Sequence, residues 1–378
     1  MKYFDAYTSN TVAGSGNQKF FCMDENEKRV GRVFYKITAG GTYQYSLLFS
    51  NIIDSTFSDG AISHKNLLCD EWYIHAARIG RCKAIDPSIP VTELVMADAG
   101  RTDIVVEDWR AITFGGQTKK TVMPGEFFCS DPTKLEFQKG EYLCLEMTFS
   151  GRMIPHHAES DLPAFIYQNG QWVFSREMPF VGMIGCDRPV VGRIAYVGDS
   201  ITQGIGTPWN SYTHWNAVLS EKIGDDYAFW NLGLGYGRAN DLAADGAWAY
   251  KAKQSDIVFV CYGVNDILRG RSAEQIKADL TSIVRTLKGL NKTVILQTVP
   301  PFDYLSGAAQ KWAEVNAYIR DELVGMVDLL FDNVPLLGKG GEQAHMALYG
   351  GHPNSEGCAV LAEALYAQVK ELLEQRRA

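Results

Sequence analysis

From Gly192 onward, short apolar runs alternate with segments of helical periodicity, and this alternation limits the possible folds more than any other feature of the chain. The apolar runs are IAYV, YAFW, IVFVCY, TVILQTV and MVDLLF, at residues 194–197, 227–230, 257–262, 293–299 and 326–331. Each run is continuous rather than alternating with polar residues, which is typical of strands buried on both faces. Such strands, separated by helices, predict a doubly wound parallel sheet with helices on both sides.

Three segments in this region place apolar residues at the spacing of one helix face. The three faces are Ile276, Leu280, Ile283, Val284 and Leu287; Trp312, Val315, Ile319 and Leu323; and Cys358, Leu361, Leu365, Val369 and Leu372. Ser272 and Gln275 precede the first face with the spacing of a capping box, in which each side chain bonds the other residue's backbone N–H. Helices are therefore expected over these segments.

The N-terminal half has a different pattern, with short alternating or aromatic-rich runs between turn residues. Examples are GRVFYKITAGGTYQYSLLFSN, beginning at Gly31, and KLEFQKGEYLCLEMTFSG, beginning at Lys134. Many short strands with such turns predict a β-sandwich or jelly-roll-like module. Because 378 residues are long for one core, we expect two domains, a β-sandwich module at 1–185 and an α/β domain at 186–378.

Composition and charge exclude several classes of protein. The net charge is −8 and the sequence pI is about 5.5, without the basic stripe that nucleic-acid binding needs. No run reaches the ~18 apolar residues of a membrane span, and the first residues lack a signal-peptide core. The eight cysteines are scattered without a CxxC pair, which suits a reducing compartment. We expect a cytoplasmic protein with no nucleic-acid or membrane partner; secretion stays open if a signal segment has been removed.

Polar residues follow the predicted strands at the points where ligands bind in parallel sheets. Ser200 lies in GDSIT after the first strand, Gly233 and Gly235 follow the second, Asn265 lies in GVND after the third, and His352 lies in HPN before the last helix. The carboxyl ends of parallel strands meet at one edge of a sheet. We therefore expect these residues to lie close together.

The residue types at this edge fit nucleophilic catalysis. A hydroxyl nucleophile needs a base and needs donors for the developing oxyanion. Ser200 is the candidate nucleophile and His352 the candidate base, with oxyanion donors from Ser200, Gly233, Gly235 and Asn265. Each residue also has a structural interpretation: Ser200 as a helix cap, Asn265 as a turn residue and His352 as a surface histidine. Arg at position 238 breaks the dinucleotide glycine motif.

GDSIT at 198–202, the Asn-Gly block at 231–237, GVND at 263–266 and HPN at 352–354 resemble the SGNH (GDSL-type) hydrolases. The resemblance implies a flavodoxin-like α/β domain and an acyl-enzyme on Ser200, with no cofactor and no metal. Asp199 and Asp266 are expected to support the site. The residues upstream are similar to a β module that precedes the hydrolase domain in some members.

The sequence departs from the family pattern at two positions. The family usually has a glycine five residues after the asparagine of the second block, where this chain has Tyr236, so Gly233 is the favoured oxyanion donor and Gly235 the alternative. The family also has an aspartate three residues before the histidine, where this chain has Tyr349.

Three explanations of the missing acid stay open. A backbone carbonyl holds His352, a carboxylate from elsewhere such as Glu342 or Asp332 replaces the aspartate, or the enzyme is impaired. A rival base is His345, which follows Glu342 by three residues but lacks the HPN context.

The favoured function is hydrolysis of small acyl esters, with acetyl preferred, on carbohydrates. The partner expected is thus a small ester or an acetylated sugar, with aromatic contacts from Trp209, Trp215, Tyr236 and Tyr349. The alternative, that the two tryptophans are core or lid residues, stays open. Alternatives are a short-chain carboxylesterase or lysophospholipase, and a catalytically impaired carbohydrate-binding protein.

A metal enzyme is disfavoured by the motifs. His156, His157 and Glu159 lie close together, but without the HExxH spacing of a zinc site. We expect them to form a solvated loop.

Overall fold

The computed structural model describes residues 2–54, 66–96 and 102–377, apart from the side chains of Glu342 and Arg377. The chain divides into two compact units. The N-terminal unit holds the described residues up to Ile53, Asn66–Pro189 and Trp209–Ser211. The C-terminal unit holds Asp54, Val190–Pro208 and the described residues from Tyr212. The chain thus enters each unit more than once.

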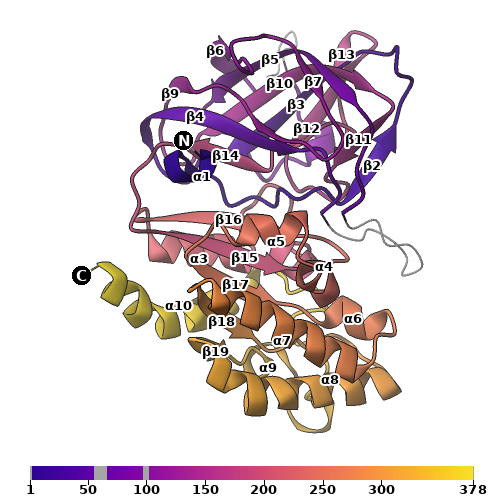
Figure 1. The fold of residues 1–378 in the computed structure, drawn as a ribbon, viewed down its shortest axis with the longest axis vertical. Helices are drawn as coiled ribbons and strands as arrows, with labels where there is room; N and C mark the ends of the chain where they lie inside the picture. Colours follow the sequence, from indigo (N-terminus) through magenta and orange to yellow (C-terminus); the bar gives the residue numbers. More distant parts are fainter. Residues whose placement is uncertain (1, 55–65, 97–101, 378) are drawn as a thin grey trace. The chain divides into compact units, whose positions relative to one another are not determined.

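The N-terminal unit is built from antiparallel strands (Figure 1). One sheet has the order β1 (Thr8–Ser9), β14 (Met183–Cys186), β4 (Gly41–Ser50) and β8 (Phe127–Cys129), and β9 (Thr133–Phe137) also pairs with β4. The other has the order β13 (Gln171–Phe174), β12 (Ala164–Gln168), β3 (Arg29–Lys36), β10 (Tyr142–Gly151), β5 (Trp72–Cys82) and β6 (Val106–Ala111), and β7 (Lys120–Val122) pairs with β5. Strands β2 (Lys19–Cys22) and β11 (Met153–His156) form a separate pair, and α1 (Tyr3–Ala6) and a 3₁₀ turn (Val91–Glu93) complete the unit.

Burial along the strands explains why the sequence predicts this architecture. In β9, Leu135 and Phe137 are buried whereas Lys134 and Glu136 are exposed, the alternation of a strand with one face on the core. β10 is instead buried along most of its length, because it pairs with both β3 and β5. The last strand of the unit, β14, ends at Cys186, one residue beyond the boundary that the sequence suggested.

The C-terminal unit is a parallel sheet with the order β16, β15, β17, β18 and β19 among the described residues. The strands are β15 (Gly192–Gly198), β16 (Tyr227–Gly233), β17 (Ile257–Cys261), β18 (Thr293–Gln297) and β19 (Leu329–Phe331). This is the 2-1-3-4-5 order of flavodoxin-like folds, as the resemblance implied. Gly198 pairs with both Gly233 and Cys261, so the segments after these three strands leave the sheet at one edge.

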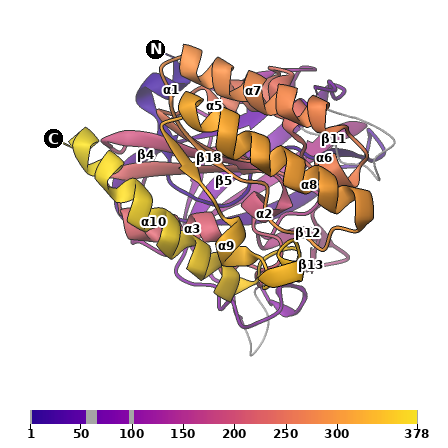
Figure 2. The same cartoon turned by 90° about the horizontal axis from the view of Figure 1, so that it is seen from below.

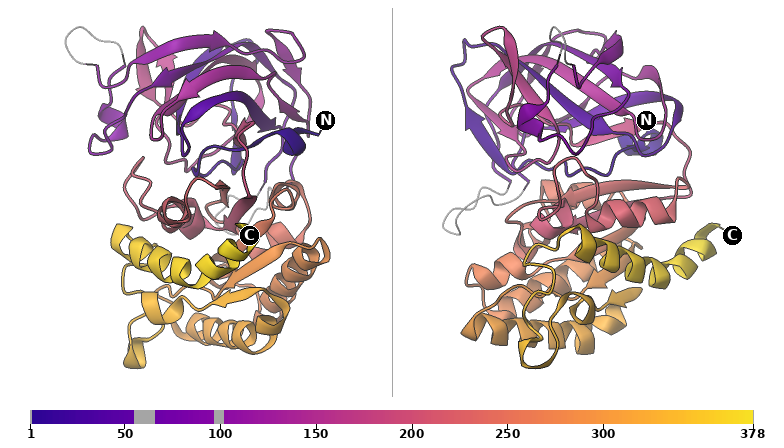
Figure 3. Two further views of the ribbon diagram at one scale, coloured as in Figure 1. Left: turned by 90° about the vertical axis from the view of Figure 1, so that its left-hand side faces the viewer. Right: turned by 180° about the vertical axis from the view of Figure 1, so that it is seen from behind.

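Helices cover both faces of this sheet (Figures 2 and 3). On one face α3 (Trp215–Ile223) packs against α10 (Ser355–Arg377). On the other lie α4 (Ala239–Ala243), α5 (Ala247–Ala252), α7 (Ala273–Gly289) and α8 (Ser306–Tyr318). Short helices follow strand ends: α2 (Ser200–Gln203), α6 (Val264–Leu268) and α9 (Val334–Leu337), with single turns at Ile319–Leu323, Val324–Met326 and Gly341–Gln343.

The helix faces predicted from the sequence are mostly confirmed. All five apolar residues expected on α7 are buried, and the Ser272–Gln275 capping box is formed. Two details differ. Leu373 rather than Leu372 is buried at the end of α10, and the last strand begins only at Leu329, since Met326 ends a 3₁₀ turn and Val327 and Asp328 form a bend.

A buried ion pair lies inside the C-terminal unit. The Nζ of Lys251, on α5, is 2.5 Å from the Oδ2 of Asp54, and the side chains are 1% and 0% exposed. A lone buried charge is costly, so each of these groups depends on the other. Among the described residues, no helix has the length and apolar content needed to cross a membrane.

Candidate active site

Ser200 is the first residue of α2 and follows the end of β15 directly. The Oδ1 of Asp199 accepts the Ile201 N–H at 3.0 Å and caps the helix. The alternative in which Ser200 itself is the cap is therefore wrong. A Cβ at Gly198 would lie 2.1 Å from the Thr202 hydroxyl and 2.6 Å from the Cys261 carbonyl, so only glycine allows this tight strand-to-helix turn.

The structure brings Ser200 and His352 together across 152 residues of sequence. The Oγ of Ser200 and the Nε2 of His352 are 2.8 Å apart, a hydrogen-bond distance, and both residues are half-buried. His352 lies in a turn before α10, where the Oδ1 of Asn354 accepts the Gly357 N–H at 2.9 Å and caps that helix. The last helix thus fixes the turn that carries the imidazole.

No acid orients His352 in the described part of the chain. Its Nδ1 has no hydrogen-bond partner there, neither a carbonyl nor a carboxylate. Asp332 is instead paired with Arg320, at 2.9 and 3.0 Å. The side chain of Glu342 lies outside the described residues. Burial lowers the pKa of His352, with no neighbouring charge acting against it.

Tyr349 does not take the place of the missing aspartate, and His345 does not take the place of His352 as the base. The ring of Tyr349 lies against α10, where a Cβ at Gly357 would be 2.7 Å from the Tyr349 Cβ. His345 makes no hydrogen bond within the described residues, and the Ser200 hydroxyl is bonded to His352. The geometry favours His352 over His345 as the base.

The N–H groups of the two glycines expected in the oxyanion hole both donate hydrogen bonds to side-chain amides in this structure. That of Gly233 donates to the Asn231 Oδ1 at 2.9 Å, and that of Gly235 donates to the Gln203 Oε1 at 2.6 Å. The role of either glycine as an oxyanion donor stays a prediction, and it would require the N–H to leave the buried amide that accepts it here. Gln203 was missed from the sequence, although it lies one helical turn after Ser200.

Two other donors at the site are not committed in this way. In the described part of the chain the Ser200 N–H has no partner, as is usual for the first N–H groups of a helix. The Asn265 Nδ2 donates to the Gly237 carbonyl at 3.1 Å, which uses one of its two hydrogens. Ser200 and Asn265 thus keep the donor capacity that the sequence assigned to them.

Tyr236 occupies a glycine-like backbone conformation. Its φ is 62°, in the left-handed region that L-residues rarely adopt. A glycine would adopt this conformation without the steric cost that a side chain brings. The half-buried ring lies 5.3 Å from the guanidinium carbon of Arg269.

The two tryptophans suggested as substrate contacts have other surroundings. Trp215 is 1% exposed and packs edge-on against Tyr196, so it belongs to the core and the expectation was wrong. Trp209 belongs to the N-terminal unit, where its ring contacts Phe174 and lies 4.1 Å from the guanidinium carbon of Arg176.

Two buried carboxyl groups support the loops of the site. Asp199 caps α2, and the Oδ2 of Asp266 accepts the Ala239 N–H at 2.9 Å. Burial raises the pKa of each to about 7. Neither is bonded to His352, so they position the backbone rather than the base.

The histidine pair outside this site is not solvated, contrary to expectation. His156 and His157 are 6% and 0% exposed, and the His156 Nδ1 lies 2.9 Å from the Arg176 carbonyl. Within residues 2–54, 66–96 and 102–377, no group of three or more His, Cys, Asp and Glu residues has the arrangement of a metal site.

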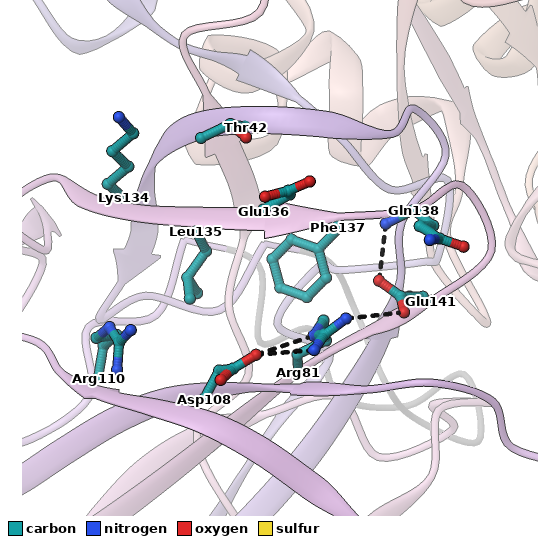
Figure 4. Close-up of a pocket in the computed structure, with 10 residues that line it drawn as sticks. All are labelled: Thr42, Arg81, Asp108, Arg110, Lys134, Leu135, Glu136, Phe137, Gln138 and Glu141. Carbon is teal, nitrogen blue, oxygen red and sulfur yellow. Dashed lines mark hydrogen bonds and ion pairs between the residues drawn. The ribbon is translucent and has the colours of Figure 1, made fainter.

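A polar cleft of about 410 Å³ lies in the N-terminal unit (Figure 4). Its lining residues are Thr42, Arg81, Asp108, Arg110, Lys134, Leu135, Glu136, Phe137, Gln138 and Glu141. Arg81 donates to Asp108 at 2.9 Å and to Glu141 at 3.4 Å. The lining contains no serine, cysteine or histidine, so this cleft has no serine–histidine pair like that of Ser200 and His352.

The fold and the site together define a class of protein: a flavodoxin-like α/β hydrolase with a serine and a histidine in contact at the edge of its sheet. A comparison with protein families matches residues 196–360 to the GDSL-like lipase/acylhydrolase family. The C-terminal domain of this chain belongs to that family, and the protein is a carboxylic ester hydrolase.

Solved structures with similarity to the chain include a member of the lipolytic G-D-S-L family from Veillonella parvula, with 20% identity, a TM-score of 0.39, and coverage of 47% of this chain and 98% of that one. The esterase EstA from a Pseudoalteromonas species has 18% identity, a TM-score of 0.37 and coverage of 48% and 98%. The acetylxylan esterase Axe2 from Geobacillus stearothermophilus has 20% identity, a TM-score of 0.39 and coverage of 48% and 95%. A search of curated proteins found no match.

Proposed function

We propose that the protein is a serine esterase that hydrolyses small acyl esters through an acyl-enzyme on Ser200. The observation that carries the proposal is the 2.8 Å contact between the Ser200 Oγ and the His352 Nε2. A neutral imidazole at this distance is placed to accept the hydroxyl proton. Burial lowers the pKa of His352 and so favours the neutral form near pH 7.

The reaction proceeds in two steps. His352 takes the proton of Ser200 while the Oγ attacks the ester carbonyl, and the oxyanion accepts hydrogen bonds from the Ser200 N–H and the second Asn265 amide hydrogen. The intermediate then expels the alcohol, which receives the proton from His352. Water, deprotonated by His352, attacks the acyl-enzyme and releases the carboxylic acid and free Ser200.

We propose that the acyl group is small and that acetyl is preferred. Tyr236 stands where the resemblance implies a glycine, next to Gly237, whose carbonyl accepts from Asn265, and we expect its side chain to limit the length of the acyl chain. A glycine there would leave the volume of that ring open to a longer acyl chain. For the alcohol, we propose a carbohydrate, because the half-buried ring of Tyr236 offers an apolar and polar surface suited to a sugar face.

Hydrolysis of p-nitrophenyl acetate by the wild type, Ser200→Ala and His352→Ala tests the mechanism. Loss of the nucleophile or base of a serine hydrolase costs about 10⁶-fold in kcat. We expect both variants to fall to background while their circular dichroism and melting stay unchanged. Turnover near the wild-type level in either variant removes that residue from the mechanism.

A substrate series tests the finer proposal. We expect activity to decrease from acetyl to butyryl to octanoyl esters and to be higher on acetylated xylo-oligosaccharides than on lysophosphatidylcholine. Preference for long acyl chains supports a lysophospholipase instead. Sugar binding without hydrolysis of any ester supports an impaired binding protein.

A further inference from the structure

Among the described residues, the imidazole of His352 is bonded at Nε2 and not at Nδ1. Tyr349 stands where the resemblance implies an aspartate, and its ring lies against Gly357 of α10. The Nδ1 has no hydrogen-bond partner in the described part of the chain. A ring bonded only at Nε2 can still turn about its side-chain torsions unless neighbouring atoms prevent it. Besides the bond to Ser200, contacts with neighbouring atoms are what can restrain the ring within the described part of the chain.

Phe302 provides the clearest of these contacts. It lies in the segment after β18, at the same edge of the sheet as the other site loops. Its ring centroid is 5.6 Å from that of His352, with the planes at 82°, the edge-to-face arrangement that aromatic rings favour. The same segment is tied to the chain before His352 by the Asp303 carboxylate, which accepts the Ala347 N–H at 3.2 Å.

Two glycines allow this contact. A Cβ at Gly351 would lie 2.8, 2.9 and 3.1 Å from three ring atoms of Phe302, so any other residue there would push the ring away. Gly206, with φ of 104°, lies against the backbone of the turn, where an added Cβ would be 2.8 Å from the His352 Cβ. The imidazole thus extends from a main chain enclosed by Phe302 and Gly206.

We propose that Phe302 is a positioning residue for His352 and that its ring, by contact, performs the orienting role that an aspartate would otherwise have. The proposal rests on the proposed function, because it assigns a role relative to the base of that reaction. An apolar ring differs from a carboxylate in one respect: it orients the neutral imidazole without stabilising the imidazolium.

The surroundings of His352 agree with a role for contact rather than charge. Burial lowers its pKa, and no charged neighbour contributes. Titratable groups on the adjoining segments are Asp303, which accepts the Ala347 N–H, Tyr304, whose hydroxyl donates to the Pro300 carbonyl, and His345 and Tyr349, which precede His352 in the chain. Removal of the Phe302 ring admits water, which raises the pKa of His352 towards that of an exposed histidine.

Kinetics of Phe302→Ala, Phe302→Leu and Leu305→Ala test the proposal. Leu305 is three residues away in the same segment and 78% exposed, so its variant is a matched control. For Phe302→Ala we expect kcat to fall about tenfold with KM within twofold, and the rising limb of the pH profile to move to higher pH. Phe302→Leu keeps an apolar contact, so its kcat and its pH profile should both lie close to those of the wild type. Leu305→Ala should match the wild type.

Two kinetic results overturn the proposal. One is Phe302→Ala with unchanged kcat and pH profile. The other is Phe302→Leu as slow as Phe302→Ala although both are folded, because a retained apolar contact would then have no value.

A titration without turnover separates this proposal from the proposed function. Histidine-selective ¹³C labelling, with His352→Ala used to assign the signal among the seven histidines, gives the midpoint of His352 by NMR. We expect a higher midpoint in Phe302→Ala than in the wild type and in Phe302→Leu. Equal midpoints overturn the positioning role. Absence of esterase activity in the wild type overturns the proposed function alone.

Discussion

His352 determines the acid limb of the pH profile. The imidazole must be neutral to accept the proton of Ser200, so kcat/KM rises with pH through the pKa of His352. Burial lowers this pKa, whereas an unperturbed histidine titrates near ~6.5. We therefore expect the midpoint of the rising limb below ~6.5, measured with p-nitrophenyl acetate from pH 4 to 8. A midpoint above that of a free histidine would show that an unseen negative charge acts on the ring.

Tyr349 stands where a carboxylate is expected, and it can be replaced by one. Tyr349→Asp places an acid three residues before His352, which favours the imidazolium, so we expect the midpoint of the pH limb to rise and kcat to increase severalfold. Tyr349→Asn has the same shape without the charge and serves as the control. Equal loss of kcat in both variants would mean that the contact of the Tyr349 ring with Gly357 matters more than the charge.

At the scale of elements, α2 is joined to the loop after β16 by one side chain. Gln203 is 3% exposed, and its side-chain Oε1 accepts the Gly235 N–H. Its main-chain carbonyl accepts a hydrogen bond from the Asn231 Nδ2 at 3.2 Å. The helix that carries Ser200 is therefore fixed to the neighbouring strand.

Replacement of this amide should affect both stability and rate. In Gln203→Leu the Gly235 N–H loses its acceptor inside the protein, which costs about 1–3 kcal/mol of unfolding free energy, and kcat should fall because Ser200 shifts. Urea unfolding and steady-state kinetics measure the two effects. Gln254→Leu is the control, since its amide bonds only the exposed Tyr250 carbonyl. Unchanged unfolding free energy and kcat in Gln203→Leu would show that α2 does not depend on this hydrogen bond.

Local sequence predicts the elements of this fold better than the contacts between its loops. The parallel strands are continuous apolar runs, and the capping box before α7 is legible in four residues. Convergence at strand ends then brings Ser200 and His352 together. The role of Gln203 and the contact of Phe302 depend on side chains from separate loops, and no spacing rule connects these.

Burial was also misjudged where composition alone guided the inference. Trp215 begins a helix in a segment rich in aromatic residues, which suggested a surface for a sugar. Its ring instead fills the layer between α3 and the sheet, against Tyr196 and Phe259. Large aromatic side chains contribute much of the burial in any core, so a tryptophan near a site carries little information about the ligand.

At the scale of the whole molecule, the stability of the fold depends on a buried ion pair between Lys251 and Asp54. Lys251→Met removes one half of a buried ion pair with Asp54, and we expect a loss of about 3–5 kcal/mol in the free energy of unfolding. The double variant with Asp54→Leu removes both charges and should recover most of that loss. Urea unfolding of Lys251→Met, Asp54→Leu and the double variant measures the coupling. Strictly additive losses would show that the two side chains contribute independently.

The ion pair of Lys251 and Asp54 limits which segment of the chain can be transferred into a chimeric protein. Asp54 belongs to the C-terminal unit although it lies more than a hundred residues before the family-matched region begins at Tyr196. A recombination cassette that starts near residue 186 would carry Lys251 into a new protein and leave its counter-ion behind. Chimeras made from such a cassette should need Lys251→Met, or the short stretch around Asp54 grafted with it. Transfer of the complete C-terminal unit thus requires two separate segments of the coding sequence.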